Sequence, residues 1–177
     1  KKQVFANASG WVLEAGSALS GNDNTDADPE VLVAIGELST SIGEADITEV
    51  EMVTTTADKS DGFTISVRVR YNEPVDVVTT GGTPTLAVTN GNEGTGTGRG
   101  PHSLSYASGT GTNELIFSLA IAAANAATNA DDVLTVGAQS IALNSGTIKD
   151  ASGTASDASL VISSAQGTAA GSVTVTA

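Results

Sequence analysis

The chain has 177 residues, a formal net charge of −13 and no cysteine. With only seven lysines and arginines against 20 acidic residues, it lacks the clustered cations that nucleic acids and anionic membrane surfaces require. Without cysteine, it has neither disulfides nor thiolate metal sites. No apolar run approaches the roughly 20 residues of a membrane helix. The length suits one sizeable core.

Residues 1–46 differ in composition from the rest and are predicted to form an N-terminal segment for attachment or oligomerisation. The only tryptophan, Trp11, stands in a short apolar stretch, and a polar, acidic loop follows over 16–30. The apolar run 31–35 is expected to be a short strand, although this region also has helical spacing. The acidic loop does not match an EF-hand, because Val31 stands where that pattern needs glycine.

The apolar residues of this segment are predicted to make its contacts, since large apolar side chains are the usual anchors of protein interfaces. The predicted interface residues are Phe5, Trp11, Val12, Leu13, Val31, Val33 and Ile35. The alternative is that they pack beneath the main domain of the same chain.

From residue 47 onward the pattern is that of an all-β, immunoglobulin-like β-sandwich over 47–165. Residues 63–71 alternate apolar and polar without a break, which places Val67 on one face and Arg68 on the other. We expect 72–74 to end this strand because they include Pro74. Further strands are predicted at 74–79, 83–90, 102–107, 113–121, 133–143 and 158–163.

The remaining segments are interpreted as connections. The glycine-dense stretch 90–100 is expected to be a hairpin tip, and the alanine-rich stretch 122–130 an irregular crossing. Residues 166–171 have the composition of a linker, and 172–176 alternate as a strand that pairs outside the main domain. Residues 166–177 are therefore predicted to form a C-terminal tail.

Several ordered blocks carry a resemblance to a known family. They are 63–67 (FTISV), 72–75 (NEPV), 82–86 (GTPTL), 104–117 (LSYASGTGTNELIF) and 141–153 (IALNSGTIKDASG). Together they resemble the bacterial immunoglobulin-like repeat found in cyanobacterial swimming-motility surface proteins and in the virion decoration proteins of tailed phages, including cyanophages. The match covers roughly 47–163 and departs from the family pattern at Thr154, where asparagine is expected.

Candidate ligand residues are few. His102, the only histidine, follows a proline at a strand start and is expected at a surface or loop position without a catalytic role. Glu73, Asp150 and Asp157 stand near predicted turns, where loop carboxylates could meet at one end of the sandwich and bind calcium. The alternative is that these acids cap turns through bonds to their own backbone.

The resemblance implies an adhesive or structural module, not an enzyme. A single repeat with its own N-terminal segment, and no apolar leader after Lys1 and Lys2, is expected of a phage virion protein. We therefore predict a capsid decoration protein that binds the major capsid protein, forms a homo-oligomer and needs no cofactor except possible calcium. The alternative is a bacterial cell-surface adhesive module that binds a host glycan or calcium.

Overall fold

The computed structural model describes residues 3–7, 10–21, 23–34, 44–91, 101–123, 128–151 and 155–177. The chain is all-β, as predicted, and its strands build a sandwich. It divides into two compact units, 1–42 and 43–177, each of which is described by itself.

The described elements are fourteen strands and one short helix. They are β1 (Val4–Asn7), β2 (Gly10–Leu13), β3 (Glu30–Ala34), β4 (Ile47–Met52), β5 (Ala57–Asp58), β6 (Phe63–Val78), β7 (Thr85–Gly91), β8 (His102–Ser108), β9 (Thr112–Ile121), β10 (Val133–Thr135), β11 (Gln139–Ser140), β12 (Thr147–Asp150), β13 (Val161–Ile162), α1 (Ser164–Ala169) and β14 (Ser172–Thr176).

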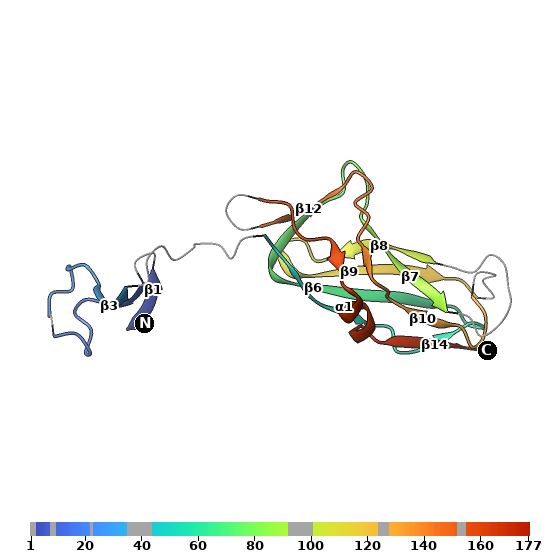
Figure 1. Ribbon diagram of the computed structural model, residues 1–177, viewed down its shortest axis with the longest axis horizontal. Helices are drawn as coiled ribbons and strands as arrows, with labels where there is room; N and C mark the ends of the chain where they lie inside the picture. The colour runs from blue at the N-terminus through green and yellow to red at the C-terminus, as the bar shows by residue number, and fades with distance from the viewer. Residues whose placement is uncertain are drawn as a thin grey trace. The chain divides into compact units, whose positions relative to one another are not determined.

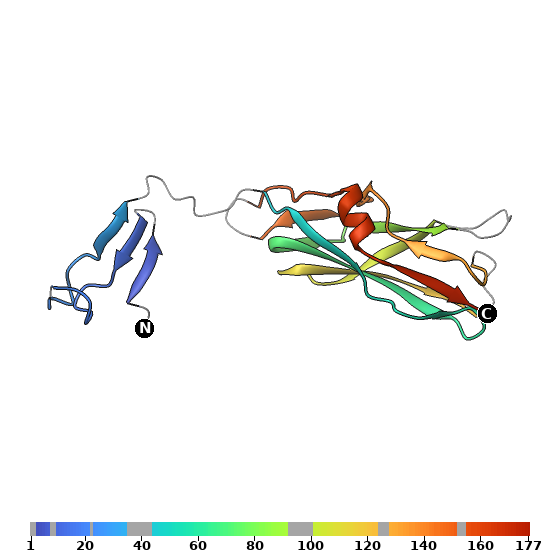
Figure 2. The same cartoon turned by 60° about the horizontal axis from the view of Figure 1, so that its bottom comes forward.

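The second unit is organised around one long sheet (Figure 1). Its strands follow the order β12-β6-β9-β8-β7-β10-β14-β5, with β4 also paired to β6, and β11 and β13 form a separate antiparallel pair. Neighbours along this path are antiparallel except β14 and β5. Figure 2 shows the strands stacked in layers, which is the arrangement of a sandwich.

The alternation predicted for 63–71 is confirmed, but its predicted end is wrong. Strand β6 runs for 16 residues, straight through Pro74. The physical reason is that Pro74 lies where the pairing of β6 changes: the register with β9 shifts between Arg70 and Val75, and β12 pairs only from Val75 onward. A residue without an N–H is tolerated at such an irregularity because no ladder bond is lost there.

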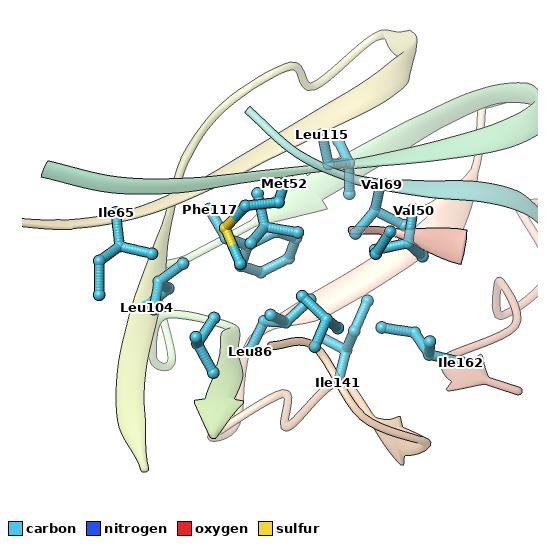
Figure 3. Close-up of a cluster of buried hydrophobic side chains, with 14 of the residues drawn as sticks. Val50, Met52, Ile65, Val69, Leu86, Leu104, Leu115, Phe117, Ile141 and Ile162 are labelled. Atoms are coloured by element: carbon cyan, nitrogen blue, oxygen red, sulfur yellow. The ribbon is translucent and has the colours of Figure 1, made fainter. Parts of the chain in front are cut away.

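The core lies between the layers and is mostly aliphatic, with Tyr71 and Phe117 as buried aromatic members. Inward residues of β6 and β9, such as Val67 and Phe117, have no exposed surface. Figure 3 shows side chains of β4, β6 and β9 pointing toward Leu86 of β7 and toward Ile141 and Ile162. Burial of these side chains stabilises the fold by roughly 25 cal/mol per Å² of apolar surface.

The strand predicted at 172–176 is confirmed, but the linker predicted at 166–171 and the pairing of that strand outside the main domain are wrong. Ser163 caps helix α1 by accepting a hydrogen bond from the Gln166 amide, and the Gln166 side chain completes the capping box. Strand β14 then lies between β10 and β5 in the sheet, with Val173 and Val175 buried. The capping box explains why α1 forms where the composition suggested a linker. Strand β14 belongs to the sandwich.

Candidate functional site

The first unit is a three-stranded antiparallel sheet in the order β1-β2-β3. The register pairs Trp11 with Val33 and Val4 with Leu13. Since cross-strand partners point to the same face and β2 alternates, Val4, Trp11, Leu13 and Val33 share one face of this sheet.

The predicted interface residues fall into three groups. Trp11, Val31 and Val33 are about half exposed, at 49%, 54% and 52%. Phe5 is partly buried, and Ile35 lies outside the described residues. Val12 and Leu13 are buried, so their side chains hold the unit together and do not form its surface.

Two exposed residues of the same sheet were not predicted. Val4 and Leu32 expose 36% and 51% of their surface. The register shift between Trp11 and Val12 leaves Leu32 as the extra residue on β3, between the partners Val33 and Val31. Every residue from Val31 to Ala34 is exposed, which a strict alternation would not predict.

The candidate cation residues are only partly brought together. Glu73 and Asp150 are both buried. Glu73 lies two positions before Val75, which pairs with Asp150, so the two carboxylates lie on the same inward face of neighbouring strands. Asp157 is on the outer side, where its carboxylate accepts a hydrogen bond from Lys149 Nζ at 3.0 Å.

Glu73 and Asp150 therefore offer two carboxylates, and calcium takes six to eight oxygen ligands. Among the residues that the structure describes, no group of three or more histidines, cysteines or carboxylates could hold a metal ion. The stretch 152–154, next to Asp150, lies outside those residues. The calcium site of Glu73, Asp150 and Asp157 stays a prediction.

The prediction of a surface position for His102 is wrong. The imidazole is only 5% exposed, and its Nε2 lies 3.2 Å from Thr128 Oγ1. Burial lowers the pKa of His102, and the charge of Asp132 opposes that shift. The signal was present in the sequence: His102 and Leu104 stand two apart on β8, and Leu104 is a core residue.

A histidine, a hydroxyl and a carboxylate thus lie near one another, but the arrangement differs from a hydrolytic site. Thr128 and Asp132 have no exposed surface, and a nucleophile must reach its substrate. Asp132 Oδ2 also accepts the Asn129 amide at 2.7 Å. These contacts fix the segment after β9 to the sandwich.

The outer face of β4, β6 and β9 carries a ladder of ion pairs. Arg70 binds Glu114 at 2.6 Å and Glu49 at 2.5 Å. Arg68 pairs with Glu51 and approaches Glu114 at 3.7 Å. The hydrogen bond from Arg70 is the main cause that lowers the pKa of Glu114. This face is polar, which is consistent with contact to solvent.

A groove of about 410 Å³ lies beside α1, between that helix and the chain around β10 and β14. Its lining consists of small and hydroxyl-bearing residues: Thr135, Val136, Gly137, Ala138, Ser164, Gly167, Thr168, Gly171 and Ser172. Charged and aromatic side chains are absent from this lining, so the groove has hydrogen-bonding capacity but no stacking platform for a sugar ring.

Comparison with known proteins finds no matching family model, curated protein or solved structure. Within the described part of the chain, no helix is long and apolar enough to cross a membrane.

Proposed function

We propose that this protein is a structural protein of a phage virion, a decoration protein that binds the capsid exterior through its N-terminal segment. The major capsid protein is the partner, and the sandwich faces solvent. The proposal rests on the resemblance of 47–163 to the bacterial immunoglobulin-like repeat. No enzymatic activity is part of it.

One observation supports attachment through the first unit. Six of the nine exposed large apolar residues of the described chain belong to residues 1–42: Val4, Trp11, Leu19, Val31, Leu32 and Val33. All of them except Leu19 lie on the strands of the small sheet, and exposed apolar residues gathered in this way are typical of a binding surface. The sandwich, in contrast, encloses its own core and presents ion pairs on its outer face.

Mass spectrometry of purified virions from the source organism is the first test, and absence of the protein from them would refute the proposal. The second test is binding to undecorated capsids. Val33→Ser and Val78→Ser are matched variants, because the two valines are 52% and 51% exposed and only the first lies in the N-terminal sheet. We expect weaker binding from Val33→Ser alone.

The second candidate function is a cell-surface adhesive module that binds calcium or a glycan. The observation that favours it is the pair of buried carboxylates, Glu73 and Asp150, on one face of neighbouring strands. A ligand that binds only the folded state raises the melting temperature. Under this alternative, calcium raises the melting temperature of the wild type but not of Asp150→Asn, and a chelator reverses the shift. No shift at millimolar calcium would exclude the calcium form of this alternative.

A further inference from the structure

His102 is a buried titratable side chain that connects two distant parts of the sandwich. It is the only histidine of the chain, it begins β8, and it is 5% exposed. Its Nε2 lies 3.2 Å from the hydroxyl of Thr128. Thr128 has no exposed surface and belongs to the segment between β9 and β10. This contact joins β8 to the 128–132 segment.

The 128–132 segment also contacts the C-terminal strand, β14. The Asp131 amide donates to Val175 O at 2.8 Å, and the Val175 amide donates to Asp132 O at 2.9 Å. Within the segment, the Asn129 amide donates to Asp132 Oδ2 at 2.7 Å. The segment therefore lies between the His102 contact on one side and β14 on the other.

The charge that acts on His102 is the carboxylate of Asp132. Strands β7, β10 and β14 contain no charged residue, and Val88, the partner of His102 on β7, is buried. The neighbouring Asp131 is exposed to solvent. The surroundings of the ring are therefore mostly apolar.

The other titratable side chains of the neighbouring elements are engaged elsewhere. The hydroxyl of Tyr106 on β8 accepts a hydrogen bond from the Thr110 amide, and Glu114 of β9 belongs to the ion pairs of the outer face. Lys59 Nζ donates to Asn129 Oδ1 at 3.4 Å, so its contact with the segment is made at Asn129.

Burial determines how protonation of His102 affects the fold. Removal from water lowers the pKa of His102, and the attraction of Asp132 opposes this shift but is the smaller effect. Protonation therefore favours a state in which the ring reaches water. The contribution of His102 to stability is complete above its ordinary pKa of about 6.5 and is lost as the pH falls through the folded value. A protonated ring also cannot accept a bond from the Thr128 hydroxyl, because both nitrogens then carry hydrogen.

We propose that the neutral ring of His102 holds the 128–132 segment on β8, and that its protonation in mildly acidic solution releases this segment and its bonds to β14. The release is a local opening of the sandwich, with the rest of the domain still folded. It is a property of the sandwich and does not depend on binding to a capsid.

The isolated full chain can be tested by NMR, because a single histidine gives one ring signal to follow in a pH titration. We expect this signal to titrate below about pH 6.5. Hydrogen exchange, corrected for its intrinsic pH dependence, measures the protection of the Asp131 and Val175 amides. Their protection should fall about threefold or more between about pH 7.5 and about pH 5.5. The Ala158 amide, which donates to Ile148 O at 3.1 Å, should keep its protection.

His102→Gln should abolish this response, because glutamine offers a donor and an acceptor as the neutral ring does, but does not titrate. Thr128→Val removes the hydroxyl, so the Asp131 and Val175 amides should be weakly protected at both pH values. Glu114→Gln, on the outer face, is the matched control. Carboxylates titrate near pH 4.3, so this variant should respond like the wild type. The wild-type measurements remain a full test if His102→Gln does not fold.

Three outcomes would overturn the proposal. A ring that titrates at or above about pH 6.5 would show that the attraction of Asp132 exceeds the effect of burial. Unchanged protection of Asp131 and Val175 while the ring titrates would show that the closed segment accommodates the charge. An equal loss of protection at Ala158 would show that acid unfolds the whole domain. Since capsids are absent, none of these outcomes bears on the decoration function.

Discussion

Neighbouring residues on β6 have opposite environments, and substitution should separate them. Val67 has no exposed surface and pairs with Phe117 in the core, whereas Arg68 contacts Glu51 on the outer face. Val67→Asp would bury an unpaired carboxylate, at a cost of several kcal/mol against a total stability of about 5–15 kcal/mol. We expect this variant to be unfolded by circular dichroism at 25 °C.

Arg68→Gln is the control for this prediction. Ion pairs at the surface contribute about 0–1 kcal/mol, and the Arg68 side chain is 31% exposed, so its melting temperature should stay within a few degrees of the wild type. A Val67→Asp protein that melts like the wild type would show that β6 buries its other face.

Glu114 should give the outer face an acid-sensitive contribution to stability. The hydrogen bond from Arg70 lowers the pKa of Glu114 in the folded state below its ordinary value. A lowered folded pKa stabilises the fold above the unfolded pKa, about 4.3, and this contribution is lost as the pH falls through the folded value. The melting temperatures of wild type and Glu114→Gln should therefore differ at pH 7 and converge in acid. A difference that persists at pH 2 would refute the assignment to ionisation.

His102 illustrates what one residue's sequence context could and could not predict. Its place on the inward face follows from its spacing to Leu104, a core residue. Its partner Thr128, 3.2 Å away, stands 26 residues along the chain, and no periodicity connects the two positions. Alternation along a strand predicts a face, whereas a contact between distant segments depends on how the sheet folds over.

At the scale of elements, two turns approach each other closely. One is the turn between β6 and β7, and the other is the turn before β12. Asn144 and Ser145 have left-handed backbone, with φ of 50° and 70°. The Asn144 side-chain amide donates to Thr83 O at 3.0 Å and to Thr85 Oγ1 at 3.0 Å. A Cβ at Gly82 would overlap the backbone carbonyl of Asn144.

Gly82→Ala should therefore be strongly destabilising. The overlap is with backbone and not with a flexible side chain, so one of the two turns must move, at a cost of about 1–3 kcal/mol or more. Gly137→Ala is the matched control, because a Cβ there meets nothing within 4 Å. Chemical denaturation of both variants would test this, and equal stabilities would show that the two turns do not approach so closely.

The elements show why the fold class was predictable while several boundaries were not. Alternation identified β6 and β9 correctly, because each has one buried face. It misplaced the end of β6, since the effect of Pro74 depends on which strand pairs there. Residues 166–171 look like a linker by composition, yet the Ser163 capping box and the burial of Gly167 make a helix of 164–169. For the candidate attachment surface, composition predicted the apolar segments, but the position of Leu32 as the extra residue on β3 required the register.

At the scale of the whole molecule, the boundary between the units lies slightly earlier than the one predicted. Composition placed it after residue 46, whereas the compact units divide after Ile42. Ala45 has no exposed surface and belongs to the core of the sandwich. Its carbonyl accepts a hydrogen bond from the Ser159 amide at 2.8 Å.

This difference predicts different stabilities for two fragments. Fragment 43–177 keeps the whole core of the second unit, so it should melt at the temperature of the full chain. Fragment 47–177 loses the Ala45 contact and two backbone bonds of Asp46: its amide donates to Asn72 Oδ1 at 2.8 Å, and its carbonyl accepts from the Asn72 amide at 3.0 Å.

Three hydrogen bonds at about 0.5–1.5 kcal/mol each, together with the buried Ala45 methyl group, amount to roughly 2–5 kcal/mol. We therefore expect fragment 47–177 to melt at least about 5 °C below fragment 43–177 in matched thermal melts. Equal melting temperatures would mean that the sandwich begins at residue 47, as composition predicts. A fragment 43–177 that melts well below the full chain would mean that the N-terminal sheet stabilises the sandwich directly.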